Sequence, residues 1–143
     1  MTTETVYAND LPYWKTGTSD PDTILDKAVA QIQSVDGVVL GRATMEIEGR
    51  AIFALRFRIG SDEYRAEWPI LQPKDPKDMK AARRQAASML FHDIKAKVVA
   101  AKAIGAKAAF FGFLELEDGR IAQQLAAPEL VTQFPRIGWN ELE

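Results

Sequence analysis

The sequence predicts an α+β domain in which an antiparallel sheet of about five strands packs against one long helix, with a second helix near the N-terminus. Apolar residues recur every three or four positions in residues 21–35 and alternate with polar ones in 38–71, whereas residues 75–104 are rich in helix formers. The 143 residues, 47% of them hydrophobic, suit one globular domain. We expect a single domain over residues 1–143, with an irregular N-terminal arm (1–19) and an irregular C-terminal tail (132–143).

The first predicted helix spans residues 21–35. Ser19 or Asp20 is suited to cap it, and Pro21 is favourable in a first helical turn. Its apolar residues share one face: Ile24, Leu25, Ala28, Val29 and Ile32. Gly37 ends the pattern, and the apolar face requires a packing partner such as a sheet.

Three strands are predicted next, because the periodicity changes to two. Gly60 and Ser61 fit a two-residue hairpin turn, and this turn sets the register of the second and third strands. The expected pairs are Phe57 with Tyr64, Leu55 with Ala66, and Phe53 with Trp68.

A three-residue loop at 49–51 is predicted between the first and second strands, because it brings apolar residues opposite one another. The expected neighbours are Ile47 and Phe53, Met45 and Leu55, and Ala43 and Phe57. The sheet then has one apolar face and one charged face. The charged face collects four arginines, Arg42, Arg56, Arg58 and Arg65, and the register makes Arg56 and Arg65 direct cross-strand neighbours. The cluster is a candidate phosphate or carboxylate receptor, but a mixed-charge ladder with Glu63 and Glu67 explains it equally well.

The second half of the chain predicts the long helix and two further strands. The helix covers residues 75–104 and ends at Gly105, a favourable C-cap. The apolar run at 106–116 predicts a central strand, and the turn at Asp118-Gly119 returns the chain through residues 120–123. A short helical turn is expected at 129–131.

Catalytic and metal chemistry receive little support from the residue types. The chain has no cysteine, and its one histidine, His92, lies about 100° around the helix from its neighbour Asp93. A turn and a solvent-facing strand end account for the acidic trio of Glu115, Glu117 and Asp118 without a metal ion. We expect a protein with no enzymatic activity, metal or cofactor. The absence of cysteine and of a long apolar run fits a cytoplasmic protein that does not bind membranes.

Charge segregation indicates a binding surface. The formal net charge is −2, yet residues 74–107 carry nine basic side chains against three acidic ones. On a helical wheel, one stripe about 60° wide contains Lys80, Arg84, Phe91, Lys95 and Lys102. Such a stripe, extended by Arg56, Arg58 and Arg65, predicts a nucleic-acid-binding protein, with single-stranded DNA favoured because Phe91 can stack a base. A solvated, lysine-rich helix face has the same appearance, so both interpretations stay open.

The aromatic residues of the arm predict an anchoring role. Tyr7, Tyr13 and Trp14 are expected to pack on the parent domain or on a second subunit, because aromatic residues are enriched at interfaces. A homo-oligomer is therefore expected.

Several short motifs occur together between residues 68 and 130. They are Trp68-Pro69-Ile70-Leu71, then Ala81, Ala82, Arg83, Gln85, Ala86, Ala87, Leu90, His92, Asp93, Lys95, Ala96 and Lys97, then Gly105, Ala106, Ala108, Ala109, Phe110 and Phe111, and finally Asp118-Gly119-Arg120 and Pro128-Glu129-Leu130. In these motifs the chain resembles small uncharacterised proteins of bacteriophages and other mobile elements. The resemblance covers somewhat under half of the chain and brings no known activity or site.

The resemblance implies nucleic-acid handling or virion assembly. The alternative to nucleic-acid binding is accordingly a structural or adaptor subunit of a phage-like assembly. The expected sheet followed by a helix is also similar in architecture to the single-stranded-DNA-binding transcription-cofactor and whirly folds, although no motif of theirs is matched.

Overall fold

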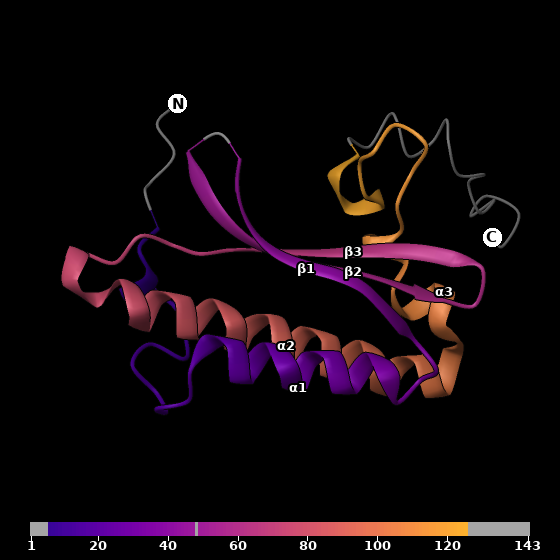
Figure 1. The fold of residues 1–143 in the computed structure, drawn as a ribbon, viewed down its shortest axis with the longest axis horizontal. Coiled ribbons are helices and arrows are strands. Elements are labelled where there is room, and N and C mark those ends of the chain that lie inside the picture. The colour runs from indigo at the N-terminus through magenta and orange to yellow at the C-terminus, as the bar shows by residue number, and fades with distance from the viewer. Residues whose placement is uncertain (1–5, 48, 126–143) are drawn as a thin grey trace, which may run out of the picture.

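Two helices cover one face of a three-stranded antiparallel sheet in the computed structural model, which describes residues 6–47 and 49–125 (Figure 1). The helices α1 (Pro21–Gln33) and α2 (Met79–Ile104) lie side by side and run in the same direction. The sheet has the order β1-β2-β3, with β1 at Val38–Ile47, β2 at Arg50–Ile59 and β3 at Asp62–Pro69. The α+β class and both predicted helices are confirmed, although α1 ends at Gln33 instead of residue 35 and α2 begins at Met79 instead of residue 75. The sheet has three strands and not five.

The core lies between the sheet and the helix layer. α1 buries the apolar face that its periodicity predicts, and α2 contributes Leu90, Ile94 and Val98. β2 and β3 supply Phe57, Tyr64 and other buried residues from the face of the sheet toward the helices. The helix layer and the sheet therefore stabilise each other through one continuous apolar cluster.

The predicted register of β2 and β3 is confirmed. Phe53 pairs with Trp68, Leu55 with Ala66, and Phe57 with Tyr64. Gly60 has a φ of +62°, as the tight turn requires. Arg56 and Arg65 are direct cross-strand neighbours, also as predicted.

The predicted register of β1 is wrong. Ile47 pairs with Arg50 instead of lying beside Phe53, which shifts the ladder of residues 41–47 by an odd number of residues and moves their side chains to the other face. Arg42 therefore lies on the helix side, where its Nη1 is 2.6 Å from Asp26 Oδ1 of α1. β1 is an edge strand with mostly exposed side chains, so its apolar residues do not fix the register.

The two further predicted strands are also wrong. After Gly105 the chain forms short helical turns, α3 (Ala106–Ala109) and η3 (Phe111–Phe113), and these bury Phe110 against β2 and β3. A short apolar run fits a buried helical turn as well as a strand, since both remove it from water. The turn before Gly119 forms, with the Gly119 N–H donating to Leu116 O at 3.0 Å. Of the pairing expected for the two further strands, the described residues form only isolated bridges. The helical turn predicted at 129–131 lies outside the described residues.

Three further short turns complete the described chain. They are η1 (Ala8–Asp10) in the arm, η2 (Pro76–Asp78) just before α2, and η4 (Ala122–Gln124) near the end of the described residues. The arm packs on its own chain, because Ala8 is fully buried and Trp14 lies against the core.

Candidate nucleic-acid interface

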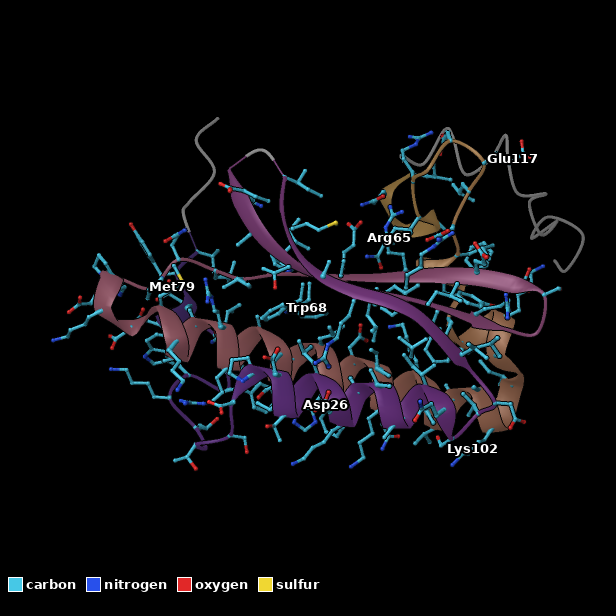
Figure 2. All side chains as sticks on the ribbon, in the orientation of Figure 1. Asp26, Arg65, Trp68, Met79, Lys102 and Glu117 are labelled. Carbon is cyan, nitrogen blue, oxygen red and sulfur yellow. The ribbon has the colours of Figure 1, made fainter. Side chains whose placement is uncertain are left out.

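The eight predicted binding residues fall on two opposite faces of the molecule. The helix layer carries Lys80, Arg84, Phe91, Lys95 and Lys102, whereas the face of the sheet away from the helices carries Arg56, Arg58 and Arg65. Figure 2 shows Lys102 at the end of the helix layer and Arg65 on the far side of the sheet. The structure therefore does not join the two groups into one path.

Glutamates form ion pairs with Arg56 and Arg65, the two arginines that are cross-strand neighbours on the sheet. Arg56 donates from Nε to Glu115 Oε1 at 2.8 Å and from Nη2 to Glu63 Oε2 at 2.6 Å. The hydrogen bond and charge of Glu115, followed by the charge of Glu63, raise the pKa of Arg56 above its ordinary value. Arg65 donates from Nε to Glu67 Oε1 at 2.7 Å. The cross-strand arginine pair is thus neutralised within the protein and offers little to a phosphate.

Arg58 differs from its two neighbours on the sheet. It is exposed, and within the described part of the chain it forms no ion pair. Its cross-strand partners are Val38 of β1 and Glu63 of β3. One exposed arginine without the other two does not make a phosphate-tracking surface.

The helix group keeps more of its positive charge. Lys80 pairs with Asp20 at 3.3 Å, but both side chains are about two-thirds exposed or more, so the pair contributes little. Arg84 donates from Nε to the neutral carbonyl of Ser19 at 2.8 Å and keeps its charge. Lys95 and Lys102 are exposed, and neither forms an ion pair within residues 6–47 and 49–125.

Phe91 lies under this stripe rather than on it. The ring is partly buried and packs against the core cluster, with Lys95 Nζ 6.0 Å from its centroid. The ring supports the lysine, and it also lines the small cleft between the arm, α1 and α2. The part of the prediction that needs an exposed ring at Phe91 gains no support from this placement.

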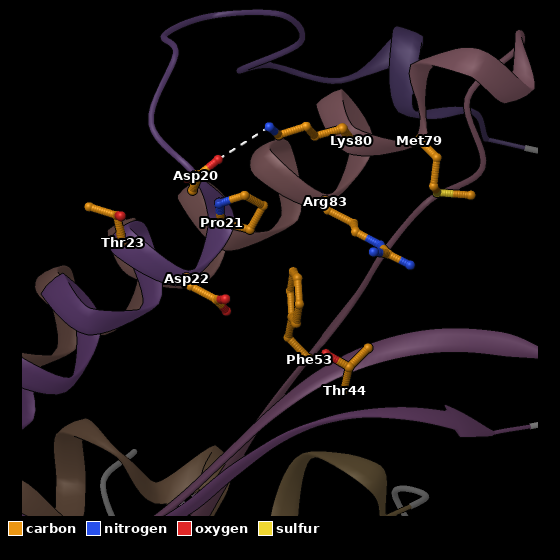
Figure 3. A pocket seen from close by; sticks show the side chains of 9 residues that line it. All are labelled: Asp20, Pro21, Asp22, Thr23, Thr44, Phe53, Met79, Lys80 and Arg83. Carbon is orange, nitrogen blue, oxygen red and sulfur yellow. Dashed lines mark ion pairs between the residues drawn. The ribbon is translucent and has the colours of Figure 1, made fainter.

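The larger of two clefts in the helix layer has balanced charge. It measures about 660 Å³ and lies where α1 and α2 begin, over Phe53 (Figure 3). Two acids and two bases line it: Asp20, Asp22, Lys80 and Arg83. Because Asp20 already pairs with Lys80, this cleft carries no net positive charge for a phosphate.

The smaller cleft has a different composition. It measures about 200 Å³ and lies between the arm, α1 and α2, with Lys27, Arg84, Ser88 and His92 in its lining. Its lining includes no carboxylate. Two cationic side chains beside a hydroxyl group are a donor set that suits an anion. We call this the arm cleft.

A buried glutamine holds the arm over this cleft. Gln85 is 2% exposed, and its Nε2 donates to the carbonyl oxygens of Ala8, Leu11 and Pro12 at 2.7, 3.2 and 3.0 Å. These contacts satisfy a polar group in the core and fix the course of the arm. The arm residues that line the cleft are positioned as a result.

Sequence reasoning missed the part that Lys27 and Tyr13 play in and beside the arm cleft. Lys27 comes from α1, and only the packing of α1 on α2 brings it beside Arg84. Tyr13, 39% exposed, stacks on His92 with ring centroids 4.8 Å apart and an interplanar angle of 14°. No periodicity in the sequence relates an arm residue to a helix residue across this distance. The aromatic character of the arm was the one available signal.

The described residues contain neither a cluster of metal-ligating side chains nor a membrane-spanning helix. No group of three or more histidine, aspartate or glutamate side chains there is arranged to hold a metal ion. None of the described helices combines the length and the apolar character needed to cross a membrane.

Comparisons with protein-family models, with curated proteins and with solved structures found no match to this chain. The resemblance to phage and mobile-element proteins stays a prediction.

Proposed function

We propose that this protein binds nucleic acid without catalysing a reaction, and that it does so through the helix layer. The observation that supports this most is the arm cleft, where Lys27 and Arg84 meet and no carboxylate lies in the lining. Lys95 and Lys102 continue the line of positive charge along α2. We call these four residues, Lys27, Arg84, Lys95 and Lys102, the basic helix face.

The length of this face suits a nucleic-acid backbone. Arg84 and Lys102 are separated by 18 residues of α2, which corresponds to about 27 Å along the helix axis. Phosphates of one strand follow one another at about 3.4 Å along a duplex, and a cation that neutralises a phosphate releases a counterion. The face is therefore long enough to contact several phosphates in succession.

Single-stranded DNA is the proposed ligand because an exposed aromatic pair lies beside the cations. Tyr13 and His92 stack on each other next to the arm cleft. A flat ring beside a cationic groove is what binding of single strands uses, since every base has a face that can stack. In this proposal Tyr13 takes the stacking role that the sequence assigned to Phe91.

The proposal is tested by fluorescence anisotropy with labelled single- and double-stranded oligonucleotides of DNA and RNA at about 50 and 200 mM salt. We expect binding that weakens steeply with salt and favours single-stranded DNA. The double variant Lys27→Gln/Lys95→Gln should lower the salt slope by about 2, one unit for each lost phosphate contact. Tyr13→Ala should weaken binding of single strands more than binding of duplexes.

A matched control comes from the sheet. Arg58→Gln removes an exposed cation on the opposite face and should leave both affinity and salt slope unchanged. Equal losses for Arg58→Gln and the lysine variant would contradict the assignment to the helix layer. Absence of binding at low salt to every oligonucleotide would refute the proposed function.

A further inference from the structure

The outer edge of β1 has no strand beside it in the described chain. The sheet order ends at β1, and β3, at the other edge, has an isolated bridge from Tyr64 to Leu114, which follows α3. β1 is ten residues long, and Val38, Leu40 and Ile47 are 50, 40 and 41% exposed. An exposed edge of this length is a template for a further strand.

The direction of the backbone groups on this edge follows from the ladder. The Ile70 N–H donates to Ala51 O at 2.8 Å, so Ala51 and every second residue after it in β2 direct their backbone groups toward β3. The alternate residues of β2 bond to β1, where their partners are Gly41, Ala43, Met45 and Ile47. The remaining residues of this stretch, Arg42, Thr44 and Glu46, therefore direct their N–H and C=O groups outward.

We propose that β1 pairs with β1 of a second copy of this chain, antiparallel and centred on Thr44, to form a continuous six-stranded sheet. In that register Thr44 lies opposite Thr44 of the second copy. Arg42 lies opposite Glu46 of the second copy, and Glu46 lies opposite its Arg42. Opposite charges directly across an antiparallel pair are favourable, and the two-fold axis creates this pair twice.

Two further features of β1 agree with this register. The β1–β2 ladder has a bulge between Val39 and Gly41, so the regular part of the strand is residues 41–47, which is symmetric about Thr44. On the outer face of the sheet, the same register places Ala43 opposite Met45 of the second copy. The exposed Ala43 and the half-buried Met45 thus each gain an apolar neighbour.

Arg42 is able to make this contact without losing its contact to α1. Asp26 is bonded to Nη1 alone, at 2.6 Å, and the Arg42 side chain is 36% exposed. A guanidinium group has five N–H donors, so a second carboxylate can be bound. The inference goes beyond nucleic-acid binding and does not depend on it, because the basic helix face lies on the helix layer and not at the sheet edge.

Charge reversal across the edge tests the inference by sedimentation velocity over a wide range of protein concentrations. The wild-type chain should form a dimer. Arg42→Glu alone, or Glu46→Arg alone, places like charges opposite each other twice and should weaken association about tenfold or more. An equimolar mixture of the two variants should form a heterodimer, because each residue then again faces its opposite charge.

The mixture also distinguishes a lost interface from a folding defect, because two unfolded variants would not regain association when they are mixed. Thr44→Pro provides a second test: it removes a backbone N–H that points outward and is not used in the β1–β2 ladder. It should abolish the dimer, whereas Thr44→Val should retain it. A wild-type chain that stays monomeric at every concentration, or an equimolar mixture that associates no better than either variant, would overturn the inference.

Discussion

The anchoring of the arm by Gln85 allows a quantitative test of the structure. Gln85→Leu keeps a side chain of similar size in the core but removes the amide that three carbonyl groups share. The two Nε2 hydrogens provide at most about two hydrogen bonds of full strength, each contributing about 1 kcal/mol net. Ala8 O keeps a second donor, the Leu11 N–H at 3.3 Å. We therefore expect the free energy of unfolding to fall by about 2 kcal/mol.

The measurement combines urea unfolding with limited proteolysis at Lys15, an exposed trypsin site in the arm. If the arm opens separately from the domain, a loss of about 2 kcal/mol increases its open population about thirtyfold. Cleavage at Lys15 should accelerate by about the same factor when opening is fast relative to cleavage. Gln33→Leu, on the exposed end of α1, is the matched control and should change stability by less than about 0.5 kcal/mol.

A Gln85→Leu variant with unchanged stability and an unchanged cleavage rate would refute the reasoning, because both measurements depend on the three carbonyl contacts. Loss of stability with unchanged cleavage at Lys15 would mean that Gln85 stabilises the core without holding the arm.

Two other predictions concern turns. Gly37→Ala should destabilise the protein by about 1–3 kcal/mol, because a Cβ there would overlap Ile32, whereas Gly41→Ala meets no atom within 4 Å and should be nearly neutral in urea unfolding. Hydrogen bonds from Arg120 hold the pKa of Asp118 below its ordinary value. The resulting stabilisation is present above the unfolded-state pKa and is lost as pH falls through the lower folded-state pKa. Carboxyl NMR should show this low pKa, and Arg120→Gln should raise it.

The two helices and the β2–β3 hairpin could be predicted from the sequence because their signals are local. Alternation along both strands and the Gly60 turn determine one register, and any slip would move buried residues into water. The start of α1 at Pro21 and the end of α2 before Gly105 likewise follow from proline's preference for a first helical turn and glycine's preference for a helix end. The basic stripe of α2 could also be predicted from the sequence, because all of its residues belong to one helix.

Elements that depend on distant contacts were predicted wrongly or missed. β1 has little burial on either face, so its pattern could not fix its register, and the ion pair of Arg42 with Asp26 comes from packing against α1. The run around Phe110 is apolar enough for a strand, but its ring reaches the core from a helical turn.

The candidate site likewise has features that the sequence determines and features that depend on the tertiary structure. Sequence alone determined which residues of α2 are basic and that they share one side of the helix. The tertiary structure decided that Arg56 of the sheet is neutralised, because it brings Glu115 from the segment after α3 to within 2.8 Å of this arginine. It also brought Lys27 into the lining of the arm cleft and stacked Tyr13 on His92 beside it. The physical reason is the distance along the chain over which each signal acts. Periodicity relates residues that are a few positions apart, whereas ion pairing and desolvation depend on groups that only the folded chain brings within a few ångströms.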